Sequence, residues 1–457
     1  MHTDKRICII GLGYIGLPTA ALLANRSYHV HGVDINQHAV DTINRGEIHI
    51  VEPELDTFVR SAVQSGKLHA DTVPAEADVF ILAVPTPFHH TDIPSACPSP
   101  NIDYVIAATR SIAPYVREGN IVILESTSPV GTTDKVAEVL AEMRPELFET
   151  SSHPVLDTGS SSSSLPQTSK VFVSHCPERV LPGHIMRELV QNDRIVGGIT
   201  PEATKATAEF YRTFVEGEVL ETDAKTAEMA KLTENSFRDV NIAFANELSM
   251  LCDQFGIDTL ELIRLANRHP RVNILQPGCG VGGHCIAVDP WFIVHAGKGS
   301  ARLIETARRV NDYKSEWVIE KVKNAYNELK IKNLKLNITK EPKIGIFGLA
   351  FKPDIDDLRE SPALYIAKRL NDELENVVCV EPNIPVDSEL KTQHSKLNIT
   401  SIEDAAGTSD LIVFLVAHRE FKQPKTRPSA ATTPQERGPN LKLNTSLVLD
   451  FCGVIKA

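Results

Sequence analysis

The sequence has few of the features that mark secreted, membrane or zinc-binding proteins. Its eight cysteines are scattered over 457 residues and none forms a Cys-x-x-Cys pair, so we expect a reduced protein without a disulfide framework. Cys279 and Cys285 have no second ligand pair at zinc-like spacing, which argues against a structural metal. The start of the chain shows no secretory apolar segment, and no apolar run is long enough to cross a bilayer. We therefore expect a cytoplasmic protein with no membrane partner.

An excess of positive charge is also missing. The formal net charge is -12 at pH 7, from 47 Lys and Arg against 59 Asp and Glu. This balance does not suit a surface for nucleic acid, so no nucleic-acid partner is expected. An acidic protein can still bind phosphate groups locally, through backbone amides at the start of a helix.

A glycine-rich turn follows the first apolar segment. Gly11, Gly13 and Gly16 form the pattern G-x-G-x-x-G between a predicted strand at 6–10 and a predicted helix at 17–25. The first glycine permits the tight turn, the second lets the backbone approach a pyrophosphate, and the third lets the helix pack on the strand. The pattern in this context indicates a dinucleotide-binding unit.

Acidic and hydroxyl side chains follow the next predicted strands. Asp34 ends a strand about 20 residues after the turn, where it can accept hydrogen bonds from a ribose diol and favours NAD over NADP. Thr86 and Thr127 follow two further apolar strands, and ligands bind beyond the carboxyl ends of such strands. Ordinary turn hydroxyls would fit the spacing of these threonines equally well. The predicted NAD site comprises Gly11, Gly13, Tyr14, Ile15, Gly16, Asp34, Thr86 and Thr127.

The pattern along the whole chain predicts an α/β fold. Strands alternate with helices at first, which implies a parallel, doubly wound sheet. Helical periodicity then dominates, with one unusually long helix expected within 226–256. At Lys343 the strand–glycine–helix pattern begins again. We expect two Rossmann-like domains joined by a long central helix and a helical dimerisation region, with domains at 1–212, 213–335 and 336–457.

Three segments rich in Ser, Pro, Thr and Gly interrupt this pattern. They read HTDIPSACPSP (90–100), HPVLDTGSSSSSLPQTS (153–169) and KQPKTRPSAATTPQERGPN (422–440). Because they lack hydrophobic periodicity, we interpret them as solvated surface insertions.

The segment PGCGVGGHCIAVDP has three interpretations: a metal site, a phosphate loop, or a loop that presents a nucleophile. As nucleophiles, Cys279 and Cys285 are equal candidates by composition. Either cysteine could equally be a small buried hydrophobic residue. The glycines are expected to leave room for a substrate beside the reacting thiol.

One helical face also carries candidate catalytic residues. Lys231, Asn235 and Arg238 have i, i+4, i+7 spacing. Such a face is most often solvated, but a partly buried lysine among apolar neighbours can shift its pKa and serve in acid–base catalysis.

Seven motifs together carry a family resemblance. In chain order they are GLGYIGLP, VPTP, STSPVG, CPERVLPG, KLTENSFRDVNIAFANEL, PGCGVGGHC and FGLAFKPDIDDLRESP. The chain resembles the UDP-glucose/GDP-mannose dehydrogenase family over nearly its whole length apart from the three insertions. The resemblance implies that a homodimer oxidises the primary alcohol of a sugar nucleotide twice, to the carboxylate, with two NAD. It also implies that 1–212 binds NAD, 213–335 holds the cysteine loop, and 336–457 binds the UDP-sugar.

The resemblance further implies roles for single residues. Cys285 matches the nucleophile, which forms a thiohemiacetal and then a thioester, so Cys279 becomes a packing residue. Lys231 matches an acid/base that also stabilises the oxyanion. The other implied catalytic residues are Asn235, Asp289, Thr127 and Glu178. The implied substrate contacts are Arg179, Val180, Lys231, Asn235, Arg238, His269, Arg271, Gly282, Phe351, Lys352 and Arg359, with Arg271 acting across the dimer interface.

The nucleophile loop indicates a branch of this family. Where the glucose branch reads GGSCxPKD, residues 282–289 read GGHCIAVD. This difference favours oxidation of UDP-N-acetyl-D-mannosamine to its uronate, for bacterial surface polysaccharide such as enterobacterial common antigen or capsule. Alternatives are UDP-glucose or UDP-N-acetylglucosamine as substrate, a catalytically silent nucleotide-sugar-binding protein, or a two-electron hydroxyacid dehydrogenase, which would need no cysteine.

Two positions depart from the family pattern. Pro182 stands where the glucose branch has a second glutamate, so water activation is expected to be arranged differently. Cys452 stands where relatives often have a basic residue, which would remove one charge contact to the nucleotide or move it to Lys456.

Overall fold

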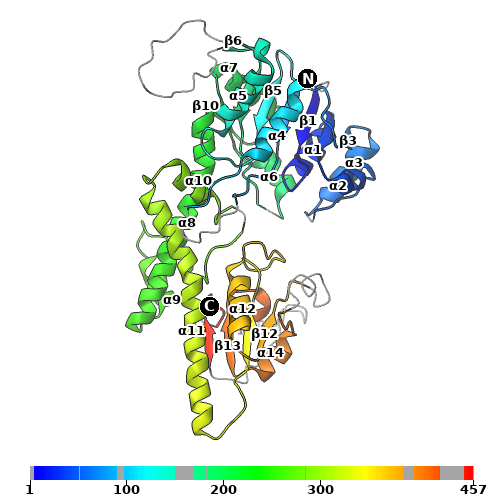
Figure 1. Cartoon of the computed structure of the whole chain (residues 1–457). Helices are drawn as coiled ribbons and strands as arrows, with labels where there is room; N and C mark the ends of the chain where they lie inside the picture. Colours follow the sequence, from blue (N-terminus) through cyan, green and yellow to red (C-terminus); the bar gives the residue numbers. More distant parts are fainter. Residues whose placement is uncertain are drawn as a thin grey trace. The chain divides into compact units, whose positions relative to one another are not determined.

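The structure is a computed structural model that describes residues 5–50, 52–89, 97–149, 168–181, 183–283, 285–384, 396–422 and 447–455 (Figure 1). The chain divides into two compact units. The first comprises Met1–Glu234 and His295–Lys298, and the second comprises Asn235–Val294 and Gly299–Ala457. Most of each of the three expected insertions lies outside the described residues.

One large sheet forms the centre of the first unit. Within the described residues its strand order is β10-β9-β8-β5-β4-β1-β2-β3. The adjacent strands run parallel except β8 and β9, which pair antiparallel over two residue pairs. The alternation of strands and helices did not predict this one antiparallel junction. The strands are β1 (Arg6–Ile10), β2 (His29–Val33), β3 (Leu68–Asp71), β4 (Val79–Leu82), β5 (Ile121–Leu124), β8 (Phe172–His175), β9 (Arg194–Gly198) and β10 (Val219–Asp223).

The strand order reverses between β1 and β4. β2 and β3 extend the sheet on one side of β1, and β4 and β5 extend it on the other. Chain connections leave in opposite directions at such a switch point, so a crevice opens beyond the carboxyl ends of the two strands. The predicted glycine turn follows β1 and therefore lies at this position.

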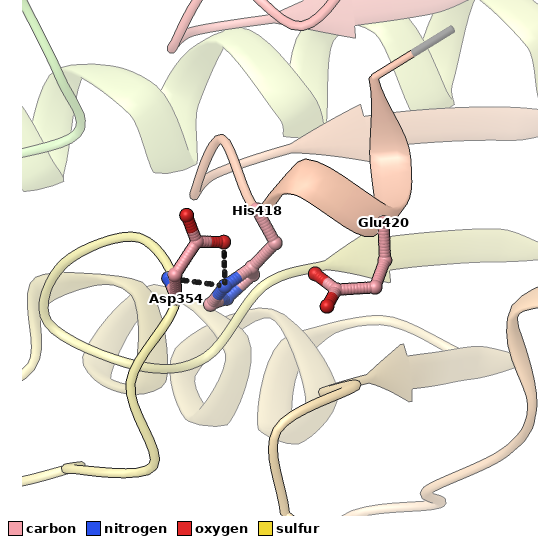
Figure 2. A group of neighbouring side chains, drawn as sticks. All are labelled: Asp354, His418 and Glu420. Atoms are coloured by element: carbon pink, nitrogen blue, oxygen red, sulfur yellow. Dashed lines mark hydrogen bonds and ion pairs between the residues drawn. The ribbon is translucent and has the colours of Figure 1, made fainter. Parts of the chain in front are cut away.

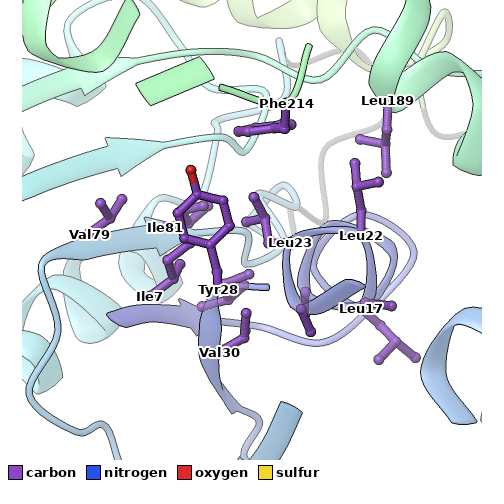
Figure 3. Packing of buried hydrophobic residues seen from close by; sticks show 14 of the residues in the cluster. Ile7, Leu17, Leu22, Leu23, Tyr28, Val30, Val79, Ile81, Leu189 and Phe214 are labelled. Atoms are coloured by element: carbon purple, nitrogen blue, oxygen red, sulfur yellow. The ribbon is translucent and has the colours of Figure 1, made fainter. Parts of the chain in front are cut away.

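Both faces of this sheet are buried. Ile7 and Ile9 of β1 pack into one hydrophobic cluster, whereas Cys8 and Ile10 pack into another, as the period of two along a strand requires. Figure 3 shows the first cluster, in which side chains of α1 lie against the sheet. The helices of this unit are α1 (Gly16–Asn25), α2 (Gln37–Asn44), α3 (Leu55–Gln64), α4 (Asp103–Ile112), α5 (Thr132–Met143), α6 (Ile185–Gln191) and α7 (Pro201–Tyr211).

Two long helices follow. The predicted long helix is confirmed as α8 (Ala224–Phe255), and a second one, α11 (Arg302–Lys335), was not separately predicted. Buried polar groups join them: Asp239 of α8 accepts hydrogen bonds from Arg308 (2.6 Å) and Asn311 (2.8 Å) of α11. Pairing compensates the cost of burying the Arg308 charge. The shorter helices α9 (Thr259–Ala266) and α10 (Asp289–Ala296) lie between them in sequence.

A second, smaller parallel sheet belongs to the second unit. Its order in the described residues is β12-β11-β13-β14, so here too the order reverses beside the first strand. These strands are β11 (Ile344–Phe347), β12 (Val377–Val380), β13 (Leu411–Phe414) and β14 (Val448–Asp450), with helices α12 (Pro362–Glu373) and α14 (Ile402–Thr408). The predicted α/β class, with two Rossmann-like sheets and a long central helix, is confirmed.

Two minor features complete the description. The short strands β6 (Phe148–Glu149) and β7 (Thr168–Ser169) pair antiparallel apart from the main sheets. Of the helices in the described ranges, none is both long enough and apolar enough to pass through a membrane.

Candidate functional site

The turn after β1 is closely packed at two of its glycines and open at the third. Gly11 has φ +93°, and a Cβ added there would lie 2.6 Å from the Ala83 carbonyl oxygen. A Cβ at Gly16 would collide with the Gly11 carbonyl oxygen at 1.8 Å. At Gly13, in contrast, an added Cβ would meet nothing within 4 Å. Two of the glycines therefore allow the chain to pack on itself, and the third leaves open space before the start of α1.

Asp34 closes this turn from the end of β2. Its carboxylate accepts hydrogen bonds from the backbone N–H of Leu12 (2.9 Å) and of Asn36 (2.9 Å). Each oxygen keeps a further lone pair, and the residue is only partly buried. The arrangement fits a ribose diol beside Asp34, with Tyr14 half-exposed and Ile15 immediately before α1.

Thr86 and Thr127 lie together at the ends of β4 and β5. The Thr86 hydroxyl donates to the Thr127 carbonyl oxygen at 2.6 Å, which joins the two loops. The Ser126 hydroxyl makes a second link, to the Val84 carbonyl oxygen at 2.6 Å. The hydroxyl of Thr86 therefore has a structural partner, and its role as a cofactor contact stays a prediction.

The first half of α8, which carries Lys231, is tied to two loops of the first unit. The buried carboxylate of Glu228 accepts from the backbone N–H of Gly131 (2.6 Å) and Thr133 (2.7 Å), at the start of α5. Glu234 pairs with Arg179 at 2.7 Å. Lys231 lies between these two anchors on the same helix and is partly buried. The STSPVG and CPERV segments are thus both fixed to the helix that carries Lys231.

Glu178 is buried in an ion pair. One carboxylate oxygen bonds to Arg194, and the other accepts from the backbone N–H of Arg179 at 2.6 Å. Arg194 is 1% exposed and also donates to the Leu189 carbonyl oxygen at 2.9 Å. Removal of either charge would leave the other buried without its partner, so this pair is fixed in place.

A second carboxyl group lies beside this pair. Glu125 follows β5 directly and is 1% exposed. Burial and then the nearby Glu178 carboxylate raise the pKa of Glu125 to about 8, so its side chain is protonated at neutral pH. Tyr211 lies 3.4 Å away as a hydrogen-bond donor. Burial also lowers the pKa of His175 to about 3, so its imidazole is neutral at neutral pH.

In the second unit, Asn235 and Asp289 meet at the nucleophile loop. The Asn235 amide donates to the Asp289 carboxylate at 2.5 Å, and both side chains are buried. Asp289 begins α10, and its backbone N–H donates to the Cys285 carbonyl oxygen at 2.9 Å. The structure thereby brings three of the predicted catalytic residues together.

The two cysteines of the loop have opposite environments. Cys285 is exposed, whereas Cys279 is 6% exposed. Burial raises the pKa of the Cys279 thiol to about 12, which leaves almost no thiolate at neutral pH. Its carbonyl oxygen accepts from the Ser315 hydroxyl at 2.8 Å, and the neighbouring Gly278 N–H donates to Asn246 at 2.9 Å. Cys279 therefore anchors the loop, and Cys285 has the accessibility that a nucleophile requires.

The room that was expected beside the loop glycines is not found at Gly282 and Gly283. A Cβ at Gly282 would lie 2.3 Å from the Glu360 carbonyl oxygen, and one at Gly283 would lie 2.9 Å from the Phe351 ring. The space is filled by the FGLAFKPDIDDLRESP segment rather than left for a substrate. These glycines are needed because the two segments pack closely, which places Gly282 and Phe351 in one cluster.

The other predicted substrate residues are distributed over the surface. Lys352 lies 5.7 Å from the centre of the Phe351 ring, and Arg359 forms a two-pronged pair with Asp357. The backbone N–H of Arg271 donates to His269 at 3.3 Å. The remaining positions are Arg238, which is exposed on α8, and Val180, which packs against the first hydrophobic cluster.

Of the two positions that depart from the family pattern, the structure describes only Cys452. Pro182, His284 and Lys456 lie outside the described residues. Cys452 follows Asp450, whose carboxylate accepts from the backbone N–H groups of Cys452 (3.1 Å), Gly453 (2.8 Å) and Ile455 (2.8 Å). Asp450 thus closes the turn after β14.

Several supporting residues were not predicted from sequence. They are Glu125, Arg194, Glu228, Glu234 and Asn246. One signal was readable for Glu125, because an acid directly after the apolar run IVIL lies at the carboxyl end of a strand. The others are tied to partners far away along the chain, such as Glu228 to Thr133, and no local pattern marks such pairs.

The buried protonated carboxyl of Glu125 predicts a pH-dependent stability. In the unfolded chain this group ionises near its ordinary value of 4.5, whereas in the folded protein it stays protonated up to about pH 8. The unfolded state therefore binds fewer protons between these values, and stability falls as the pH rises through this window. Glu125→Gln keeps the shape of the side chain but cannot ionise. We therefore expect the free energy of unfolding at pH 8 to rise by on the order of 1–3 kcal/mol, with a higher melting temperature, and both to change little at pH 5.

The measurement is thermal unfolding at both pH values, with the exposed Glu142→Gln as the matched control. A gain of the same size at pH 5 and pH 8, or a loss at pH 8, would contradict a protonated Glu125.

Comparison with known proteins places these features in one family. Three sequence models of the UDP-glucose/GDP-mannose dehydrogenase family match the chain: the NAD binding domain at residues 5–215, the central domain at 225–313 and the UDP binding domain at 345–456. The chain is 54% identical to the UDP-N-acetyl-D-mannosamine dehydrogenase of Escherichia coli (strain K12), over 91% of this chain and 94% of that protein. It is 53% identical to an NDP-N-acetyl-D-galactosaminuronic acid dehydrogenase of Ralstonia nicotianae, over 92% of each chain.

A solved structure agrees with these sequence relatives. The UDP-D-ManNAc dehydrogenase of Pyrococcus horikoshii has a TM-score of 0.77 and 35% identity, over 99% of this chain and 96% of that chain. The glycine turn with Asp34, the exposed cysteine loop and the second parallel sheet thus occur in a chain that belongs to the UDP-glucose/GDP-mannose dehydrogenase family, whose members are NAD-dependent nucleotide-sugar dehydrogenases.

Proposed function

We propose that this protein oxidises UDP-N-acetyl-D-mannosamine to UDP-N-acetyl-D-mannosaminuronate with two NAD, for bacterial surface polysaccharide. The single observation that carries the proposal is the pair of environments on the nucleophile loop. Cys285 is exposed next to the Asn235–Asp289 contact, and Cys279 is buried. A two-electron dehydrogenase or a silent binding protein has no use for an accessible thiol held in this way. The sugar follows from relatives of that name, which are more than 50% identical to this chain.

The proposed chemistry proceeds in two oxidations. NAD, which the glycine turn and Asp34 would hold, would supply the hydride acceptor for each of them. Lys231 takes the hydroxyl proton in the first, which gives the aldehyde. The Cys285 thiolate then adds to the aldehyde carbon and forms a thiohemiacetal, which can lose a second hydride and become a thioester. Water cleaves the thioester to the carboxylate and returns the thiol.

The surrounding residues have supporting roles in this proposal. Asn235 and Lys231 stabilise the oxyanion at the reacting carbon, for which each well-placed donor contributes about 3–4 kcal/mol in comparable sites. Asp289 orients Asn235 through their hydrogen bond and helps position the hydrolytic water. Glu178 is held in a buried ion pair with Arg194, so we assign Glu178 to orienting water with Thr127 rather than to removing its proton.

The wider assignments are part of the same proposal. We propose that 1–212 binds NAD through the turn and Asp34, that 213–335 carries the catalytic helix and loop, and that 336–457 binds the UDP-sugar. The substrate contacts are those that the family resemblance implied. A cytoplasmic location suits a reaction that consumes NAD and a nucleotide sugar.

A second candidate substrate is favoured by the comparisons. The relative from Ralstonia nicotianae is as similar as the mannosamine enzymes, and its name specifies an N-acetylgalactosaminuronic acid. Both sugars carry an acetamido group, so the proposal of a UDP-linked acetamido sugar is common to the two. UDP-glucose and UDP-N-acetylglucosamine are the remaining alternatives.

We further propose a homodimer through α8. Phe237, Phe244 and Leu251 repeat at seven-residue spacing and are 68%, 53% and 39% exposed. Phe255, at the end of the helix, is 65% exposed. Large apolar side chains in a seven-residue repeat form the seam of paired helices. The family resemblance implied that Arg271 acts across the dimer interface, and we propose this role for it in such a dimer.

The oxidation state of the product tests the proposed reaction. We expect about two NADH for each UDP-N-acetyl-D-mannosamine consumed, because the thioester route removes four electrons. The measurement is NADH absorbance against sugar nucleotide consumed, with UDP-N-acetylgalactosamine, UDP-N-acetylglucosamine and UDP-glucose as the comparison panel. A ratio of one, or no turnover with any of the four, would overturn the proposal, whereas preference for the galactosamine sugar would select the second candidate.

The nucleophile is tested by two matched serine variants. Cys285→Ser should abolish acid formation, because serine cannot be ionised at this pH, and should leave at most slow first-step oxidation. Cys279→Ser should keep the activity, since the buried thiol does no chemistry. Product acid is measured by mass spectrometry. Loss of equal size in both variants would show that the choice of Cys285 is wrong.

The dimer is tested by charge on the α8 face. We expect the native protein to have twice the 50.2 kDa mass of one chain in light scattering, and Phe237→Asp combined with Phe244→Asp to have the mass of one chain. The charge would have to be buried in the apolar seam. Leu334→Asp, at an exposed position on α11, is the control and should leave the mass unchanged. A dimer that persists in the double variant would place the interface elsewhere.

A further inference from the structure

In both sheets a glycine with positive φ follows the first strand, and an acidic residue from the end of the neighbouring strand bonds to the turn. The surroundings of this acidic residue differ between the two sheets. Gly348 follows β11 with φ +95°, as Gly11 follows β1 with φ +93°. An added Cβ at Gly348 would lie 2.5 Å from Val416, just beyond β13 across the switch point. The acid at the end of β12, Glu381, takes the position that Asp34 takes at the end of β2.

Glu381 is completely engaged by the chain itself. One oxygen accepts from the backbone N–H groups of Leu349 (2.7 Å) and Ala350 (2.9 Å), and also meets His418 Nε2 at 3.2 Å. The other accepts from the Asn383 N–H at 3.2 Å. The side chains of Glu381 and His418 are both fully buried. Unlike the partly exposed Asp34, Glu381 therefore cannot receive a ribose diol.

His418 joins Glu381 to the loop that follows the turn. Its Nδ1 accepts from the backbone N–H of Asp354 and from the Asn383 amide, both at 2.9 Å. Two donors at Nδ1 fix the ring proton on Nε2, where it is donated to Glu381. Asp354 has φ +63°, a conformation that a non-glycine residue keeps only when its surroundings hold it.

The loop held in this way carries the predicted UDP-sugar residues. Phe351 bonds through its N–H to the Asp357 carbonyl oxygen at 3.1 Å, and the Ser361 hydroxyl donates to the Leu349 carbonyl oxygen at 2.6 Å. Phe351 in turn packs against Gly283 of the nucleophile loop. The contacts run without a gap from His418 through residues 349–361 to the loop of Cys285.

We propose that His418 and Glu381 are positioning residues, which form a buried clamp that holds residues 349–354 in the shape that binds the uridine diphosphate of the substrate. The proposal rests on the proposed function for the identity of that ligand. Within the clamp Glu381 is fully hydrogen-bonded to the protein, so it cannot bind the ribose of a dinucleotide as Asp34 can. The second sheet therefore binds a nucleoside diphosphate and not another NAD.

A metal site is the competing interpretation of the same group. Figure 2 shows Asp354, His418 and Glu420 facing one another, and their potential ligand atoms lie within 4.8 Å. Both ring nitrogens of His418 are already bonded, Nδ1 to two N–H groups and Nε2 to Glu381. Neither nitrogen keeps a lone pair directed at a cation, so the geometry favours the clamp.

Three substitutions of His418 test the clamp. Two of them each keep one of its hydrogen-bonding groups, and the third keeps neither. His418→Asn keeps an acceptor near the Nδ1 position, His418→Gln keeps a donor near Nε2, and His418→Leu keeps neither. We expect the KM for the UDP-sugar to rise by about threefold in each of the first two and by about tenfold or more in the third, since each lost hydrogen bond to a charged or backbone group weakens the loop. The kcat and the KM for NAD should stay within about twofold of the native values.

Direct titration with UDP separates the clamp from the proposed reaction. We expect UDP affinity to fall in the same order as the KM rises, and this binding needs no turnover. If the native protein binds UDP but oxidises no UDP-sugar, the proposed function fails while the clamp is still judged by the UDP affinities. Unchanged UDP affinity in all three variants would overturn the clamp, as would a fall in kcat with unchanged KM.

Glu420→Gln is the matched control, because Glu420 belongs to the metal interpretation only. We expect its UDP affinity to equal that of the native protein, with or without EDTA. Tighter UDP binding on addition of Zn²⁺, lost in Glu420→Gln, would overturn the clamp in favour of a metal. Unaltered kcat at saturating UDP-sugar, which requires Cys285 of the second unit, together with unaltered NAD affinity shows that both units of the His418 variants are folded.

Discussion

In both sheets the chain leaves the first strand in a tight turn that has no space for a side chain. At Gly11 and at Gly348 the backbone has positive φ, and the space of the absent Cβ is filled by the residue beyond the neighbouring strand. The acid from the second strand then bonds to the backbone amides of the turn, Asp34 in one sheet and Glu381 in the other. The cofactor turn and the UDP-sugar loop both start from this constraint. The two differ in whether the acid is left for a ligand or is consumed by the protein.

Buried charge is the second organising feature, and each case has its own compensation. Arg194 and Arg308 are both 1% exposed, and each bonds to a carboxylate, from Glu178 and Asp239 respectively. Glu125 has no cation of its own, so its raised pKa keeps it neutral. Ion pairs of this kind contribute little net stability but are costly to break, which makes them suitable for fixing loops in one place. The CPERV segment is fixed in this way by Glu178 and Arg194.

Much of this could be predicted from sequence, because local patterns determine it. The apolar runs, the glycines and the helical periodicity predicted β1, β2, β4 and β5 of the first sheet, the strands of the second sheet, the glycine turn and α8. The strands β3, β8, β9 and β10 were not predicted. Asp34 was found because a strand-ending acid has a fixed distance from the turn. The antiparallel junction of β8 and β9 was not predicted, because the alternation of strands and helices implies parallel neighbours and no local pattern marked this exception. The partners of Glu228, Arg194 and His418 also escaped, because each contact joins segments that only the folded chain brings together.

The packing of Gly282 and Gly283 against Phe351 and Glu360 bears on how sugar preference could be redesigned. These two glycines are needed because the nucleophile loop packs closely against another protein segment, and this need does not depend on which sugar is bound. A change there would separate the segments before it altered any contact with the hexose. Neighbouring positions of the same loop, such as 286–288, are therefore better places than the glycine pair to change the sugar preference.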